Sequence, residues 1–136
     1  MSASIICLFG LIIWSITLIL LLLGARAKYF LGGQLVFDQQ GIDLGGTSQR
    51  ITRAQANSLE WLVIPSALLI YGIANGQSEI TDGLAMVVLG SRILQSIVHI
   101  VSVSLLAILV RATLFTIQVV VWVIWSYEFY SAAALV

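Results

Sequence analysis

Apolar residues dominate four long stretches of the chain, and the polar residues between them form breaks of very unequal length. The apolar stretches cover about residues 5–24, 54–73, 84–103 and 105–125. Each is close to the ~20 residues that a helix needs to cross the hydrocarbon core of a bilayer. Backbone groups in lipid must bond within their own segment. The pattern therefore predicts an all-α integral membrane protein, a bundle of four transmembrane helices in one domain over residues 1–136.

The breaks between the stretches predict how the helices are oriented in the membrane. The first break, about residues 25–52, is long and glycine-rich and carries Arg26, Lys28 and Arg50. The second, about residues 74–83, carries two carboxylates and no basic residue. Because short cytoplasmic loops are enriched in Lys and Arg, the first loop is expected in the cytoplasm and both termini outside. The third break is so short that the last two helices must form an antiparallel pair.

The composition agrees with a membrane protein and argues against several other classes. Hydrophobic residues make up 60% of the chain and charged residues 9%, whereas a soluble domain has roughly 25% charged residues. The formal net charge of zero gives no basic excess for nucleic acid. Cys7 and His99 are the only residues of their types, so the sequence predicts neither a disulfide within the chain nor a metal site. Trp61 and the aromatic residues near the C-terminus are expected to anchor the helices at the membrane–water interface.

Polar residues are concentrated in residues 50–60, which lead into the second apolar stretch. At 100° per residue on a helix, four of them share one narrow sector and Gln55 points elsewhere. The four are Arg50, Arg53, Asn57 and Glu60. Polar side chains at membrane depth are costly, and they usually pair with one another or bind a ligand. This stripe is therefore the first candidate for a site.

Two further polar stripes lie on the third and fourth predicted helices. Arg92, Gln95 and His99 are spaced three and four residues apart and so share one face. Arg111 begins a stripe on the fourth helix that continues to Gln118. The predicted topology brings these stripes together at the cytoplasmic end, with Arg92 the deepest. The excess of positive charge at that end suits an anionic ligand.

Each residue of these stripes also has a purely structural interpretation. Arg50 taken alone is best interpreted as a charge that flanks a helix end. Glu60 and Arg92 could form an ion pair that makes two buried charges tolerable, and this is as well supported as a ligand role for either. His99 could be an interfacial histidine, and Arg111 could extend to the lipid headgroups. Taken together, however, so many polar groups on one end exceed what packing requires.

The pattern Arg50-x-x-Arg53-Ala54-Gln55-x-Asn57-x-x-Glu60 resembles a signature of the membrane-associated proteins in eicosanoid and glutathione metabolism, the MAPEG family. The match is closest to the leukotriene-forming synthase branch. Four spans and one long cytoplasmic loop are also similar to that family. The resemblance implies a homotrimer of four-helix subunits, in which glutathione binds between neighbours at the cytoplasmic side.

The resemblance also implies roles for individual residues. On the second helix, the residues that match contacts to the glutathione backbone are Arg53, Gln55, Asn57 and Glu60. Arg26 matches a basic residue that meets a glutathione carboxylate, and Arg111 resembles the arginine that activates the thiol. The candidate glutathione-binding set is completed by Arg50, Arg92 and His99.

These observations predict a membrane-bound glutathione-dependent transferase or peroxidase that acts on a hydrophobic electrophile. A thiol of pKa about 8.5 is mostly protonated at neutral pH, and the permanently charged guanidinium of Arg111 would stabilise the thiolate. Family enzymes often carry tyrosines where Gln95, His99 and Phe115 stand here, so a non-catalytic lipid-binding or scaffold member of the same family is the alternative. A small transporter is a weaker hypothesis, because the charged groups gather toward one side of the membrane and a continuous polar path across it is not evident.

Overall fold

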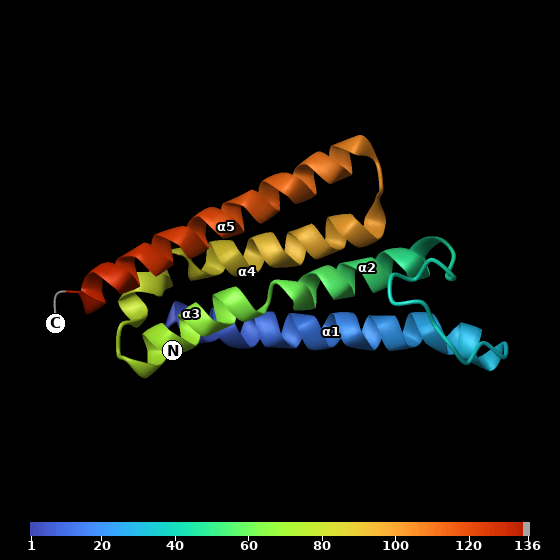
Figure 1. Cartoon of the computed structure of the whole chain (residues 1–136), viewed down its shortest axis with the longest axis horizontal. Helices are drawn as coiled ribbons and strands as arrows, with labels where there is room; N and C mark the ends of the chain where they lie inside the picture. Colours follow the sequence, from blue (N-terminus) through green and yellow to red (C-terminus); the bar gives the residue numbers. More distant parts are fainter. Residues whose placement is uncertain (135–136) are drawn as a thin grey trace.

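The computed structural model describes residues 1–134 of the chain and consists of helices joined by short connections (Figure 1). The helices are α1 (Ala3–Leu31), α2 (Gly46–Glu60), α3 (Val63–Ala74), α4 (Ser78–Val101) and α5 (Leu105–Ala133). Four helical segments of the described chain are long and apolar enough to cross a membrane, with α2 and α3 together forming the second. The prediction of an all-α, four-span membrane protein is confirmed.

The helices extend further than the apolar stretches from which they were predicted. α1 continues to Leu31, so Arg26 lies on the helix and the first connection shrinks to residues 32–45. α2 begins at Gly46, eight residues before the expected position 54. Hydropathy marks the part of a helix that lipid surrounds, whereas the backbone remains helical for as long as its hydrogen bonds continue. The polar stripe of residues 50–60 therefore lies on a fully formed helix.

The second span is broken in the middle, although the hydropathy pattern predicts one uninterrupted helix. α2 ends at Glu60 and α3 begins at Val63. Pro65 has no N–H to donate to the carbonyl of Trp61, and a proline ring clashes with the carbonyl four residues earlier. The helical bonding resumes at the next residue, where the Ser66 amide donates to the Leu62 carbonyl at 3.2 Å. The break thus falls directly beside the polar stripe.

Both termini lie at one end of the bundle, and the 32–45 connection and the α4–α5 turn lie at the other (Figure 1). α4 contacts each of the other helices, including α1, α2 and α5. The connection between α4 and α5 is confined to Ser102–Ser104, where the Ser104 hydroxyl caps α5 by accepting from the Ala107 amide at 3.2 Å. The expected antiparallel pair is therefore present. Which end faces the cytoplasm stays a prediction.

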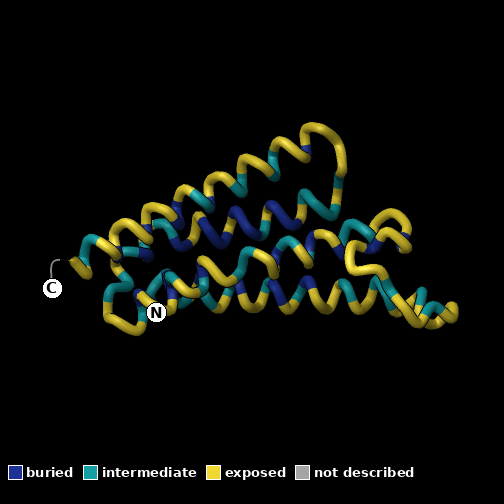
Figure 2. Tube along the Cα trace, in the orientation of Figure 1, coloured by how far each residue is buried: buried dark blue, intermediate teal, exposed yellow. Residues whose placement is uncertain are grey.

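The apolar core fills the half of the bundle that carries the termini. It comprises Cys7, Leu11, Leu69, Ala85, Val88, Leu89, Val121, Trp122, Trp125 and Phe129. Gly72 lets α3 approach α5 closely, since a Cβ there would lie 2.9 Å from Phe129 Cζ. Much of the outer face of α5 is exposed in the single chain (Figure 2). The core thus fixes one end of the bundle, and the polar stripes occupy the opposite end.

Candidate functional site

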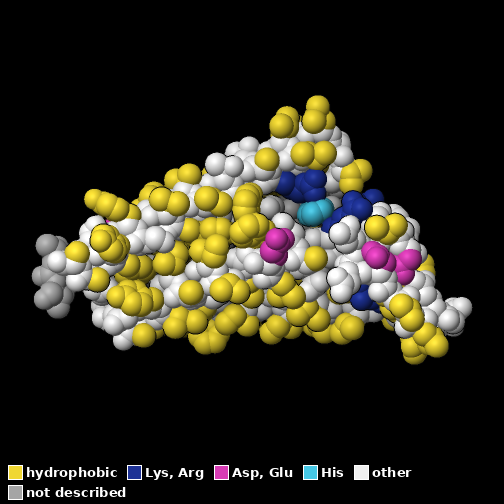
Figure 3. All heavy atoms as spheres, viewed as in Figure 1, with side chains coloured by type: hydrophobic (Ala, Val, Ile, Leu, Met, Phe, Trp, Pro, Cys, Tyr) yellow, Lys and Arg dark blue, Asp and Glu magenta, His cyan; other side chains and the backbone are white. Residues whose placement is uncertain are grey.

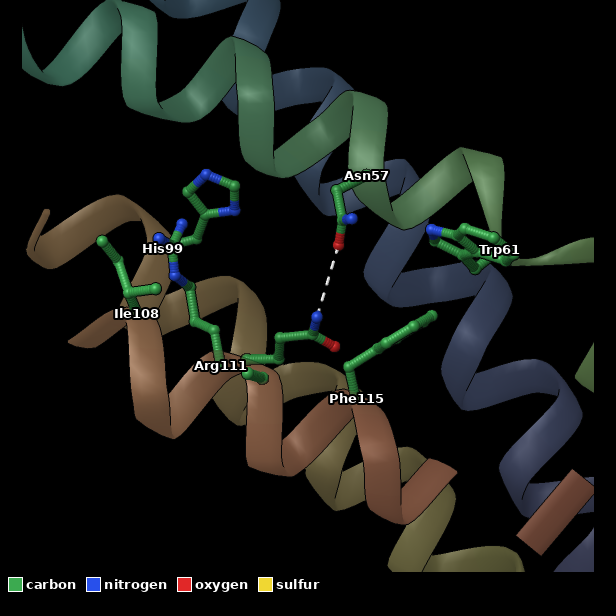
Figure 4. A pocket seen from close by; sticks show the side chains of 8 residues that line it. Asn57, Trp61, His99, Ile108, Arg111 and Phe115 are labelled. Atoms are coloured by element: carbon green, nitrogen blue, oxygen red, sulfur yellow. Dashed lines mark hydrogen bonds between the residues drawn. The ribbon is translucent and has the colours of Figure 1, made fainter. Parts of the chain in front are cut away.

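Two adjoining hollows lie between α2, α4 and α5 near the α4–α5 turn, and Figure 4 shows the first from close by. The first has a volume of about 220 Å³, and the second about 290 Å³. His99, Ile108 and Arg111 line both, so the two hollows adjoin at these residues and are treated together as the candidate site. On the face drawn in Figure 3, basic side chains gather beside the histidine at this end, acidic side chains lie near them, and hydrophobic side chains are spread over the rest of the bundle.

The wall of this site is cationic. Arg50 and Arg53 come from α2 and Arg111 comes from α5, and no carboxylate among residues 1–134 lines either hollow. Arg111 Nε is buried and has no hydrogen-bond partner in that part of the chain, while Arg53 is exposed. A concave surface lined by one sign of charge concentrates ions of the opposite sign. The site therefore favours an anion.

Arg50 differs from the other two arginines because its side chain is already engaged. Its Nε donates to the Ile100 carbonyl at 2.6 Å, and one terminal nitrogen donates to the Thr47 hydroxyl at 3.0 Å. The carbonyl belongs to the last turn of α4, where helix carbonyls lack partners within the helix. Arg50 lies within α2 and ties that helix to the end of α4.

Aromatic and amide groups form the deeper wall of the first hollow. The Trp61 and Phe115 rings lie 5.2 Å apart between centroids, and Phe115 packs edge-on against Trp122 at 6.1 Å. Asn57 accepts a hydrogen bond from Gln95 Nε2 at 3.5 Å, drawn as a dashed line in Figure 4. The site thus joins a cationic opening to an apolar wall, a combination that suits a ligand with charged and hydrophobic parts.

Arg92 lies behind this wall and lines neither hollow. Its side chain is only 2% exposed, and Nη1 and Nη2 have no hydrogen-bond partner within residues 1–134. Its Cζ lies 6.0 Å from the centroid of the Trp122 ring. Glu60 is exposed at the end of α2, so the Glu60–Arg92 ion pair is not formed within one chain. A buried guanidinium without a carboxylate partner is energetically costly.

Three further candidates lie outside the hollows of the single chain: Arg26, Gln55 and Glu60. Arg26 donates to the Asp38 carbonyl at 3.4 Å and stacks over Phe37. Five of the nine predicted residues are brought together, namely Arg50, Arg53, Asn57, His99 and Arg111. A signal for Trp61 was present in the sequence, because it follows Asn57 by four residues and so shares its helix face. Gln49 precedes Arg53 and Gly46 precedes Arg50 by the same spacing, whereas Val103, in the α4–α5 turn, lines the second hollow without such a signal.

The residues that surround the site leave little provision for a metal ion. In the described part of the chain, no three His, Cys, Asp or Glu side chains come close enough together to hold one. The donors at the site are instead guanidinium, carboxamide and imidazole groups. Such groups bind carboxylates and amides through hydrogen bonds.

These features define a four-span helical membrane protein with a cationic hollow at one end. The chain matches the family model of the MAPEG family over residues 4–129, and it therefore belongs to the MAPEG family. The match is to the family as a whole and does not resolve a branch within it. No curated protein and no solved structure matches the chain. Proteins of this family use glutathione, so membership supports a glutathione-related transferase or related function in the membrane.

Proposed function

We propose that the protein is a membrane-bound glutathione-dependent transferase or peroxidase that acts on a hydrophobic electrophile. The observation that carries this proposal is the cationic hollow, which is lined by Arg53 and Arg111 and continues into the Trp61–Phe115 aromatic wall. Glutathione is an anionic peptide, and its carboxylates match the guanidinium groups of the opening. The apolar wall would receive the electrophile from the membrane.

In this proposal, the residues of α2 bind the peptide part of glutathione. Arg53 is exposed and free to form a bidentate pair with a carboxylate. Asn57 contacts a peptide group, and His99, which lines both hollows, donates a hydrogen bond from its ring. Arg50 contributes positive charge at the opening. These contacts would position the thiol of glutathione beside α5, the helix that carries the proposed catalytic residue.

Arg111 is the proposed catalytic residue. Its guanidinium would lie beside the sulfur, where it favours the thiolate over the thiol. Each unit by which the thiol pKa falls corresponds to about 1.4 kcal/mol of preferential stabilisation of the anion. In conjugation, the thiolate attacks an electrophilic carbon, a C–S bond forms, and the leaving group departs with the electron pair. In peroxide reduction, two glutathione thiols are oxidised to a disulfide while the hydroperoxide becomes an alcohol and water.

The four candidates outside the hollow of one chain are proposed to act in a homotrimer. Arg26, Gln55 and Glu60 would contact glutathione at the boundary between neighbouring copies. Arg92 would support the site from behind its wall. Crosslinking in detergent tests the oligomer: a trimer is expected, and a monomer that retains glutathione binding would contradict this part of the proposal.

We further propose that the hollow opens toward the cytoplasm. Arg26, Lys28 and Arg50 lie at the end of the bundle that carries it, and Glu79 and Asp82 lie at the opposite end. Labelling of an introduced Gln39→Cys by an impermeant thiol reagent, in a Cys7→Ser background, tests the orientation in intact cells. Protection before permeabilisation is expected, and full labelling of intact cells would reverse the assignment.

A non-catalytic lipid-binding or scaffold role is the second candidate, and one observation favours it. Two apolar hollows of about 300 and 400 Å³ follow one another along α3 and α5 and share Ser126. Trp122 lines the first of them, and Tyr71 and Tyr130 line the second. A groove of this kind would suit an acyl chain without any reaction taking place.

Purified protein in a detergent that preserves its oligomer distinguishes the two candidates. The enzyme should bind reduced glutathione and either conjugate it to chlorodinitrobenzene or reduce a lipid hydroperoxide. Arg111→Ala should abolish turnover and leave much of the glutathione affinity, while Lys28→Met, which removes a cation outside the hollows, should retain both activities. Binding without turnover would favour the scaffold role, and absence of glutathione binding would overturn the glutathione-dependent proposal.

A further inference from the structure

Three carboxamide side chains from three different helices are linked in series, from the core of the bundle to the wall of the first hollow. Gln118 Nε2 of α5 donates to Gln95 Oε1 of α4 at 3.0 Å, and Gln95 Nε2 donates to Asn57 Oδ1 of α2 at 3.5 Å. Gln118 is 0% exposed and lines neither hollow, Gln95 is 6% exposed, and Gln95 and Asn57 both line the first hollow. The series therefore runs from the core of the bundle to the surface of the proposed ligand site.

Contacts at the buried end of this series determine which amide atom donates and which accepts in each hydrogen bond. Gln118 Nε2 also donates to the Leu114 carbonyl at 3.0 Å, and a carbonyl can only accept. The nitrogen of Gln118 must therefore face that carbonyl, and its two hydrogens are shared between Leu114 and Gln95. Gln95 must then present its oxygen to Gln118. Because the oxygen and the nitrogen of a carboxamide lie on opposite sides of its carbon, the Gln95 nitrogen then faces away from Gln118.

The same reasoning carries the direction forward to the hollow. Since Gln95 presents its nitrogen to Asn57, Asn57 must accept through Oδ1 (Figure 4). Its Nδ2, with two N–H donors, remains for a ligand. A hydrogen-bond acceptor such as a carboxylate or peptide carbonyl is matched by these donors, and a ligand N–H is not. The main-chain carbonyl of Leu114 thus determines what Asn57 can recognise.

We propose that Gln95 and Gln118 are positioning residues that orient the Asn57 amide so that the site selects a hydrogen-bond acceptor of the bound thiol peptide. This inference rests on the proposed function only for the identity of the ligand. If Gln118 is replaced by an apolar residue, the Gln95 amide can turn over, and Asn57 then presents Oδ1 to the ligand acceptor. The site loses one hydrogen bond and gains a repulsive contact.

A double-mutant cycle with reduced glutathione tests the proposal on the full chain in detergent. Gln118→Met should weaken glutathione binding by about 3- to 10-fold, the range expected for one neutral hydrogen bond. In the Asn57→Ala background the same change should have less than about 2-fold effect, because no amide remains to be oriented. Thr116→Val, on the exposed face of α5, is the matched control and should leave the affinity unchanged.

A ligand-free measurement separates this proposal from the proposed function. The chain contains two asparagines, Asn57 and Asn75, and Asn75 Nδ2 donates to the Tyr71 carbonyl at 2.8 Å, far from Gln118 along the bundle. In protein with isotope-labelled asparagine, Gln118→Met should shift the Asn57 side-chain amide signals and leave those of Asn75 in place. Gln95→Met should give the same result if Gln118→Met does not fold.

Each outcome has a distinct meaning. Wild-type protein that binds no glutathione, together with an Asn57 shift in Gln118→Met, would overturn the proposed function and support the orienting role. An equal loss of affinity in both backgrounds, or an unchanged Asn57 signal, would overturn the orienting role and reduce Gln95 and Gln118 to packing residues.

Discussion

The first turn of α1 is held by a carboxylate from α4, and removing that carboxylate gives a sharp test of how the bundle is stabilised. The Ser4 amide donates to Asp82 Oδ1 at 2.7 Å, and the Ser4 hydroxyl donates to the same oxygen at 2.6 Å. Ser4 and Thr81 are fully buried, and their hydroxyl oxygens lie 2.6 Å apart. Because the first amides of a helix have no partner within it, Asp82 satisfies a group that would otherwise be unpaired.

Asp82→Ala should lower the free energy of unfolding by about 1–2 kcal/mol. Loss of a side-chain cap costs about 0.5–2 kcal/mol, and a bond to a charged acceptor contributes about 1.5–3 kcal/mol. The two donors share one oxygen, so their contributions do not add in full, and the partly exposed position of Asp82 lets water replace some of the lost bonding. Asp82→Asn retains an oxygen acceptor, so its free energy of unfolding should fall by about half as much as that of Asp82→Ala.

Unfolding by denaturant in mixed micelles, followed by tryptophan fluorescence, measures this difference. Glu79→Ala is the matched control, because Glu79 is an exposed acid in the first turn of the same helix. Glutathione affinity should remain unchanged in Asp82→Ala, since Asp82 lies at the end of the bundle opposite the hollows. Equal stabilities for Asp82→Ala and Glu79→Ala would refute the capping argument.

Two other predictions concern close packing and helix ends. Gly72→Ala should lower stability by about 1–3 kcal/mol through overpacking against Phe129 Cζ, which a Cβ would approach to 2.9 Å; Gly90→Ala, where a Cβ would meet nothing within 4 Å, should be neutral or stabilising by up to about 1 kcal/mol. The same unfolding assay compares the two variants, and an equal loss of stability in both would contradict overpacking against Phe129. Arg50→Met should lower the stability of the ligand-free protein by about 1–2 kcal/mol, because it removes the 2.6 Å bond to the Ile100 carbonyl; unchanged stability with weaker glutathione binding would instead make Arg50 a ligand contact.

The number and type of the spans were predictable from the sequence, because hydropathy reports directly on which segments lipid can surround. The helix ends were not, since capping and hydrogen bonding determine them once the chain leaves the apolar region. Tyr29 illustrates this point, as its hydroxyl accepts from the Gly45 amide at 3.2 Å and holds the start of α2 beside α1. The break in the second span had a visible signal in Pro65, whose effect falls on the carbonyl of Trp61 four residues earlier.

Helix periodicity made one part of the candidate site predictable, namely which residues share a face of the same helix. The spacing of Arg53 and Asn57 places them on one face of α2, and both line the hollows. The rotation of one helix relative to another is not encoded in that spacing. Glu60 and Arg92 can be assigned to neighbouring helices, yet packing turns the first outward and buries the second. A main-chain partner such as the Ile100 carbonyl leaves no trace in the sequence.

The polar stripes also explain why the hollow stays open at one end of a bundle that is closed at the other. The first turns of α5 bury little: Leu105 and Leu106 are each 72% exposed. Closing this end would bring Arg53 of α2 toward Arg111 of α5, and like charges in a partly apolar setting repel strongly. The core at the opposite end fixes α5 in place without requiring that closure. Positive charge on both walls therefore opposes closure of this end, and the same charge makes the space between the walls attractive to an anion.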